Sequence, residues 1–184
     1  MSTSTATQAA RTTWKIDPAH SHIEFSVRHL MITTVKGRFG GVDGTVVIDE
    51  SDRAKSGVDV RIEASSIDTR EPQRDAHLRS ADFFDVETFP YLTFKSTQVS
   101  DPRSGEFSVK GNLTIHGVTR DVVLNVTEEG RGKDPWGGER AGFSATTKIN
   151  RNDYGLNWNQ ALETGGVVVG DEVKIRLELQ LVHV

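Results

Sequence analysis

The strongest indication of the fold is the stretch Val173-Lys174-Ile175-Arg176-Leu177-Glu178-Leu179-Gln180-Leu181, in which every second residue is apolar. Successive side chains of a β-strand point to opposite faces. The stretch therefore predicts a long strand with one buried face and one solvent-facing side.

The same alternation recurs through most of the chain. It is clean in three further segments: 23–28, 58–64 and 107–115. Weaker strand patterns cover six more: 14–17, 35–39, 44–49, 91–99, 121–126 and 142–149. Glycine, proline, serine and aspartate separate these segments, so short turns join them. Short connections favour pairing of sequence neighbours in antiparallel meanders.

One segment breaks the strand rhythm. Residues 71–84 predict a helix with Pro72 in its first turn, where the missing N–H costs little. A second, shorter helix is expected over residues 151–154.

Length and composition indicate one domain of ordinary size. The chain has 184 residues, 35% of them hydrophobic, with 17 glycines and no cysteine. The missing cysteines exclude disulfides, thiolate nucleophiles and thiolate-bound zinc or iron–sulfur clusters. The polar residues 1–12 predict a disordered tail, and residues 13–184 the folded domain.

Charge and hydropathy exclude several partners. A net charge of −4, with lysines and arginines that do not cluster along the sequence, argues against nucleic-acid binding. No stretch reaches the roughly 18 apolar residues of a membrane span. The first residues lack the basic start and apolar run of a secretory signal, so a cytoplasmic location is expected.

Antiparallel strands with one apolar face can bury it in a two-sheet sandwich or in a closed barrel. Small residues fall on the apolar faces, among them Ala64, Gly111, Ala145 and Thr147. Because small inward side chains leave room, the pattern favours a barrel with an internal cavity.

Catalytic and metal-binding patterns are weak. His20 and His22 share a strand face, but no third ligand accompanies them. No Gly-x-Ser-x-Gly elbow is present, and Asp82 and Asp85 follow a helix, where carboxylates commonly serve as caps. We therefore predict no metal, no cofactor and no catalytic residue.

The aromatic residues offer a more specific hypothesis. Phe83, Phe84, Phe89 and Tyr91 crowd one span beside the predicted helix, and they form either ordinary core or a lid over an apolar cavity. Tyr154 and Trp158 are candidates for the same opening. Arg28 and His29 are candidates to meet a polar head group, with a solvent-facing Arg28 as the alternative.

Several short blocks, taken together, resemble the YceI-like family of polyisoprenoid-binding proteins. The chain carries them in the family's order: Asp17-Pro18-Ala19-His20-Ser21, Phe25-Ser26-Val27-Arg28-His29-Leu30, Val35-Lys36-Gly37-Arg38-Phe39, His77 to Pro90, Gly111 to Arg120, and Ile149 to Leu156.

The resemblance implies an all-β fold: an extended, lipocalin-like antiparallel β-barrel with one helix near the barrel mouth. It also implies a long isoprenoid or quinone-like lipid in the lumen, and a homodimer in many members. Tyr154 stands where phenylalanine is common. Matching the strands residue by residue gives the expected lining: Phe25, Val27, Phe39, Val60, Ile62, Phe84, Leu92, Phe94, Leu113, Ile115, Phe143, Ile175 and Leu177.

The hypothesis from the sequence is a non-enzymatic carrier or store that shields an isoprenoid tail from water, with Arg28, His29 or Tyr154 at the head group. One alternative is an enzyme, such as a hydrolase, lyase or isomerase, that acts on a small hydrophobic substrate with His29 or His77 as acid and base. The other is a filled β-sandwich that mediates protein contacts.

Overall fold

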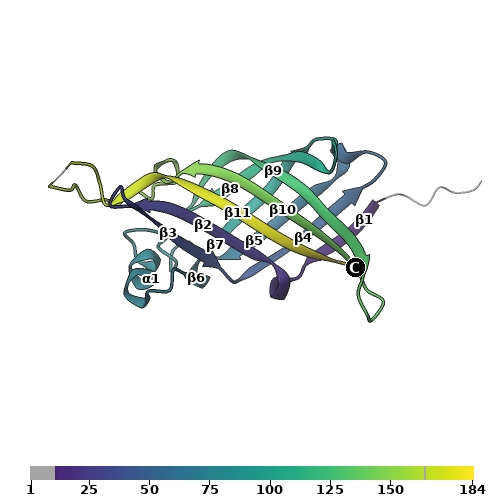
Figure 1. The fold of residues 1–184 in the computed structure, drawn as a ribbon, viewed down its shortest axis with the longest axis horizontal. Helices are drawn as coiled ribbons and strands as arrows, with labels where there is room; N and C mark the ends of the chain where they lie inside the picture. The colour runs from purple at the N-terminus through teal and green to yellow at the C-terminus, as the bar shows by residue number, and fades with distance from the viewer. Residues whose placement is uncertain (1–10, 164) are drawn as a thin grey trace, which may run out of the picture.

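Antiparallel strands form a closed eight-stranded barrel with one α-helix packed beside it (Figure 1). The computed structural model describes residues 11–163 and 165–184. The strands are β1 (Arg11–Ile16), β2 (His22–His29), β3 (Thr33–Phe39), β4 (Val42–Asp49), β5 (Gly57–Glu63), β6 (Ile67–Asp68), β7 (Tyr91–Val99), β8 (Glu106–Ile115), β9 (Val118–Lys133), β10 (Glu139–Asn150) and β11 (Val169–His183). The helices are α1 (Pro72–Arg79) and four 3₁₀ turns: η1 (Pro18–His20), η2 (Arg53–Lys55), η3 (Ala64–Ser66) and η4 (Arg151–Tyr154).

The long C-terminal strand closes the barrel. Hydrogen bonding follows the circuit β1-β4-β5-β7-β8-β9-β10-β11, and β11 returns to β1. β11 pairs with β2 along one part of its length and with β1 along the other, with Val173 opposite Val27 and Leu181 opposite Ile16. β2 and β3 extend the wall at one end of the barrel, where β6 pairs with β3. The strand with the strongest alternation in the sequence thus joins the two edges of the sheet.

The predicted barrel is confirmed, with some boundaries displaced. The strands expected at 121–126 and 142–149 extend to 118–133 and 139–150, and the two-residue β6 had no sequence signal. β1 includes Arg11 and Thr12, which pair with β4 although the sequence assigned them to the tail. The rest of the expected tail lies outside the described residues.

The helix is shorter than the sequence predicts. Pro72 does occupy its first turn, and the Glu71 side chain accepts from the N–H groups of Gln73 and Arg74. The helix ends at Arg79, because Ser80 adopts an extended backbone and bonds back to the His77 carbonyl through both its N–H and its hydroxyl. Residues 80–84, expected to be helical, therefore form turns.

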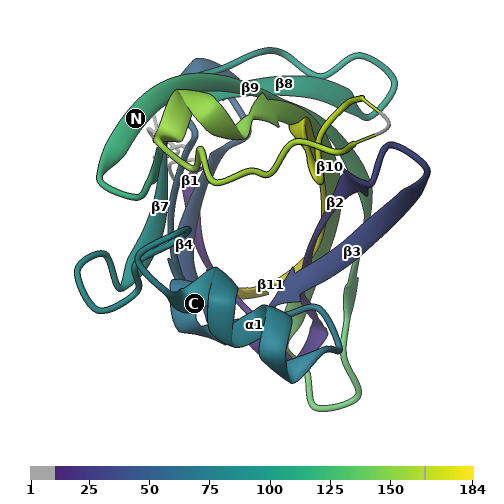
Figure 2. The ribbon, with the colours of Figure 1, turned by 90° about the vertical axis from the view of Figure 1, so that its left-hand side faces the viewer.

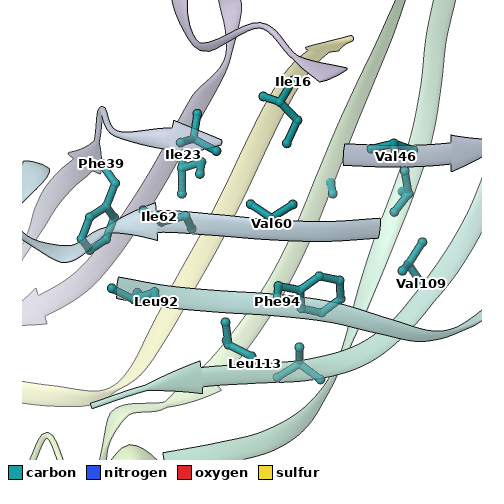
Figure 3. Packing of buried hydrophobic residues seen from close by; sticks show 14 of the residues in the cluster. Ile16, Ile23, Phe39, Val46, Val60, Ile62, Leu92, Phe94, Val109 and Leu113 are labelled. Carbon is teal, nitrogen blue, oxygen red and sulfur yellow. The ribbon is translucent and has the colours of Figure 1, made fainter. Parts of the chain in front are cut away.

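Alternate side chains of every strand meet inside the barrel. Figure 3 shows residues of β1, β2, β3, β4, β5, β7 and β8, from Ile16 to Leu113, directed into one apolar cluster. The expectation that small inward residues leave room is wrong at Gly111. A Cβ there would lie 2.5 Å from the Phe94 ring, so the aromatic side chain already fills the space. Much of the interior is filled by the protein's own side chains.

The two ends of the barrel differ. α1 and the segment after β10 lie at the end that faces the viewer in Figure 2, which we call the helix end. The β4–β5 and β7–β8 turns lie at the opposite end, which we call the far end (Figure 1). Within the described part of the chain, no helix is long and apolar enough to cross a membrane.

Candidate functional site

The apolar cavity of the barrel lies toward the far end. It encloses about 90 Å³ between β4, β5, β8, β9, β10 and β11, and its surface is almost entirely carbon. Phe107 and Phe143 meet edge to face in its wall, with their ring centres 6.2 Å apart. The lining comprises Val46, Val47, Ile48, Arg53, Ser56, Gly57, Val58, Val99, Phe107, Val109, Leu124, Val126, Phe143, Ser144, Ala145, Leu177, Leu179 and Leu181.

Aromatic residues gather at the helix end. The Phe84 ring meets Phe39 edge to face at 5.8 Å. Phe83 is buried, and its ring lies 5.4 Å from Trp158 and 5.1 Å from the His77 ring of α1. The helix, the turn that follows it and the segment after η4 thus meet in one aromatic cluster.

Arg151 fixes the segment that crosses the helix end. Its side chain is 4% exposed and donates to the carbonyls of Leu156, Trp158, Val169 and Gly170. Burial lowers the pKa of the guanidinium, and Asp171, 3.8 Å away, opposes that shift. A single cation thereby joins η4, Trp158 and the start of β11.

Tyr154 carries a buried hydroxyl without a partner. The residue is 1% exposed, and its hydroxyl oxygen has no hydrogen bond among the described residues. Burial raises the pKa of the phenol to about 12, with Asp153 adding to the shift and Arg120 opposing it. A buried, unpartnered hydroxyl costs about 1–3 kcal/mol unless another group meets it. The Tyr154 hydroxyl is thus a buried hydrogen-bonding group that none of the described residues meets.

The residues expected to line the lumen occupy three environments. Phe143 and Leu177 line the far-end cavity. The buried core holds Phe39, Val60, Ile62, Leu92, Phe94, Leu113, Ile115 and Tyr154, with Phe25 and Phe84 packed against it. Val27 and Ile175 are half-buried on β2 and β11, and Ile175 also borders a groove on the outer wall.

The two candidate head-group residues on β2, Arg28 and His29, lie in different environments. Arg28 is exposed, and its guanidinium donates to Thr34 Oγ1 and the Met31 carbonyl at the β2–β3 turn. Arg28 therefore faces solvent, which was the alternative to a head-group contact. His29 is half-buried and pairs with Val169 and Thr33. Alternation along the strand puts His29 on the same face as Phe25 and Val27.

Of the aromatic residues expected beside the helix, Tyr91 lies elsewhere. It is exposed, with the Arg61 guanidinium 4.6 Å from its ring centre. Trp158 packs edge to face on His77 at 4.8 Å. His77 Nε2 lies 2.8 Å from an Asp82 oxygen. The described residues contain no cluster of three histidine or acidic side chains suited to a metal ion.

Sequence reasoning missed most of the cavity lining. Val109 and Phe107 lie on the same face of β8 as Leu113, and Leu179 and Leu181 continue the face of Leu177. The period-two pattern of these strands therefore puts the four residues on the same face as Leu113 and Leu177, which the family resemblance had given as lining. The pattern does not show at which position along the barrel the interior is left unfilled.

Comparison with protein families and with curated proteins identifies relatives of this chain. The YceI-like domain matches residues 14–181. A UPF0312 protein of Staphylococcus aureus is 42% identical over 164 residues, which cover 89% of this chain and 93% of that protein. A UPF0312 protein of Vibrio cholerae is 45% identical over 138 residues, covering 75% of this chain and 73% of the relative.

Solved structures share the fold. BcnA of Burkholderia cenocepacia aligns with a TM-score of 0.78 at 24% identity, over 90% of this chain and 98% of that one. The YCEI protein of Campylobacter jejuni aligns with a TM-score of 0.71 at 30% identity, over 84% and 88%. A polyisoprenoid binding domain from Saccharophagus degradans aligns with a TM-score of 0.65 at 18% identity, over 96% and 100%.

Proposed function

Because the chain belongs to the YceI-like domain family, we propose that it binds a long isoprenoid lipid, of polyprenyl or quinone type, inside the barrel and releases it unchanged. The observation that carries this proposal is the interior of the barrel. A continuous apolar cluster runs through it and ends in a cavity with an almost purely carbon surface. The family likeness to a polyisoprenoid binding domain supports the same ligand class.

The driving force is the removal of the ligand's tail from water. Burial of apolar surface contributes about 25 cal/mol per Å², so a long unbranched or methyl-branched tail is favoured in proportion to its length. The far-end cavity holds about 90 Å³, whereas pockets for drug-sized molecules span roughly 300–1,000 Å³. Uptake therefore requires interior side chains, with Phe107 and Phe143 foremost, to move apart.

The polar head group of the ligand binds at the helix end in this proposal. Tyr154 supplies a hydroxyl that no described residue meets, and His29 lies on the inward-facing side of β2. The Tyr154 hydroxyl can donate a hydrogen bond to the oxygen of a quinone carbonyl or of a polyprenol hydroxyl. Arg28, which faces solvent beside Thr34, is left out of this head-group site.

The test is extraction of the purified protein with organic solvent, followed by mass spectrometry, and uptake of solanesol as a polyprenyl probe. Ala145→Leu, which adds bulk to the cavity, should reduce uptake, and Val123→Leu on the exposed outer wall is the matched control. Absence of any extracted lipid together with no solanesol uptake contradicts the proposal.

The enzymatic alternative rests on His77 and its 2.8 Å contact with Asp82 beside the aromatic cluster. Mass spectrometry of the recovered ligand separates the two functions. A carrier returns solanesol with its mass unchanged. A product of altered mass that disappears with His77→Gln supports the enzyme.

A further inference from the structure

The lysines and arginines that are scattered along the sequence gather in space on one outer wall of the barrel. A groove of about 800 Å³ there is bordered by Lys36, Arg38, Arg70, Lys148, Lys174 and Arg176, which we call the basic groove. Among the described residues that border it, the carboxylates are Glu24 and Asp68. The chain as a whole carries −4, so the residues outside the groove carry a net charge of −8.

The centre of the groove is a row of cross-strand neighbours. Lys148 on β10 lies opposite Lys174 on β11, which lies opposite Ser26, which in turn lies opposite Lys36 on β3. Within the described residues, none of these three ammonium groups is within 4.0 Å of a carboxylate, whereas Arg38 pairs with Asp68 and Arg176 with Glu178. Like charges directly opposite each other on a sheet are destabilising. An anionic surface placed against the row would relieve that repulsion.

The hairpin that forms one side of this wall ends in exposed apolar side chains. Leu30, Met31 and Ile32, which we call the apolar tip, are 37%, 53% and 72% exposed. Leu30 and Met31 have positive φ angles of 52° and 62°, a region that disfavours large side chains. The β2–β3 turn therefore holds large apolar residues where glycine or asparagine would be easier to accommodate.

The apolar tip touches the segment that crosses the helix end. The Leu30 N–H donates to the Val168 carbonyl, and Met31 lies against Gly166. Arg151 connects the same segment to Trp158 and β11. Whatever the apolar tip enters is thus brought next to the helix end of the barrel. Asp171 and Glu172 are the acidic residues of β11 toward this end.

We propose that the apolar tip and the basic groove dock the barrel on an anionic lipid bilayer, with the tip inserted and the outer wall of β2, β3, β10 and β11 facing the lipid head groups. Apolar side chains beside lysine and arginine form the combination by which proteins bind at a bilayer surface. Charge complementarity selects an anionic surface, and three aliphatic side chains select lipid over nucleic acid. The proposal goes beyond lipid binding in the lumen but relies on it for its purpose, the transfer of the ligand.

The experiment is co-sedimentation of the full chain with vesicles of phosphatidylcholine alone and of phosphatidylcholine with phosphatidylglycerol. Wild type should bind only the anionic vesicles, and less as salt is raised. Ile32→Ser should weaken binding about tenfold. Lys36→Gln with Lys174→Gln should weaken it roughly thirtyfold, at about 1 kcal/mol for each lysine near the surface.

Two matched controls use the rest of the molecule. Trp136→Ser removes an 87% exposed aromatic residue from the β9–β10 turn, at the far end. Lys95→Gln with Lys110→Gln removes two charges from the outer faces of β7 and β8. Both should leave vesicle binding unchanged. Circular dichroism of every variant establishes that loss of binding is not loss of fold.

Three outcomes overturn the proposal. The first is that wild type does not bind anionic vesicles, and the second is that the apolar-tip or lysine variants bind them as well as wild type does. The third is a dimer on size-exclusion chromatography that Ile32→Ser dissociates, with no binding to vesicles. The last result assigns the apolar tip to a second copy of the chain. Solanesol uptake from detergent, measured on the same preparations, is independent of docking. Uptake without vesicle binding contradicts docking alone, and vesicle binding without uptake contradicts the proposed ligand alone.

Discussion

Phe25 on β2 lies directly opposite Gly37 on β3, and its ring covers the space that a side chain at position 37 would occupy. A Cβ at Gly37 would come within 2.7 Å of the Phe25 Cε1 atom and 2.9 Å of Thr69 Cγ2. The Phe25 ring also packs on Phe39 at 5.7 Å. An aromatic ring laid over a cross-strand glycine fixes the register of the two strands.

Gly37→Ala is therefore expected to lower the free energy of unfolding by about 1–3 kcal/mol, because the added methyl displaces a packed ring. Urea denaturation measures the loss. Combining it with Phe25→Leu should recover part of that loss, since the smaller side chain gives way. Gly132→Ala, at a position with no atom within 4 Å of the new Cβ, is the control and should be nearly neutral. Equal losses in the two alanine variants would contradict this account.

Tyr154→Phe is expected to raise the free energy of unfolding at neutral pH by about 1 kcal/mol, because it removes a buried hydroxyl that has no partner. If the hydroxyl meets a ligand's head group, the same variant should bind polyprenols and quinones less tightly. Thermal unfolding with and without ligand measures both effects. Lower stability of the variant would show that the hydroxyl has a partner in the folded protein.

The same residue predicts a dependence on alkaline pH. The pKa of Tyr154 rises from 10.0 to about 12 on folding, so the unfolded chain loses this proton first. This titration leaves the free energy of unfolding unchanged below pH 10 and lowers it as the pH rises toward 12, by up to roughly 3 kcal/mol. Wild type should lose stability more steeply than Tyr154→Phe across that window. If the free energy of unfolding falls equally with pH in wild type and in Tyr154→Phe, this prediction is wrong.

Arg151→Lys is expected to lower the free energy of unfolding by about 3 kcal/mol, because an ammonium group cannot reach the four carbonyls that the buried guanidinium satisfies. Digestion with a protease other than trypsin, such as chymotrypsin, should also cleave the variant near Trp158 faster than it cleaves the wild type. The control is Arg176→Lys, since Arg176 is exposed and pairs only with Glu178. Similar behaviour of the two variants would contradict the role given to Arg151.

Leu177→Ala enlarges the far-end cavity and should lower the free energy of unfolding by about 2–4 kcal/mol. If the cavity receives the ligand, solanesol should raise the midpoint of thermal unfolding more in this variant than in wild type. A variant that is destabilised but gains nothing from solanesol would place the ligand elsewhere.

The period-two pattern predicted the strands, because each residue's face is set locally by the geometry of an extended chain, and the family resemblance predicted that they close into a barrel. It also gave Phe143 and Leu177 as inward residues. It could not indicate β6, whose two residues pair with β3, nor the end of α1 at Ser80. Such short elements depend on contacts made after the chain has folded.

Three features could be read from the amino-acid sequence alone: the apolar face of each strand, the absence of thiol chemistry and the family to which the chain belongs. The packing of the strands puts Phe25 and Phe94 in the space beside Gly37 and Gly111, leaves apolar space unfilled at the far end, and gives the Tyr154 hydroxyl no partner among the described residues. It also brought Lys36, Lys148 and Lys174 together, although they are far apart in the sequence. The physical reason is that direction is a local property of a strand, whereas cavity volume, hydrogen-bond satisfaction and charge density depend on which strands become neighbours.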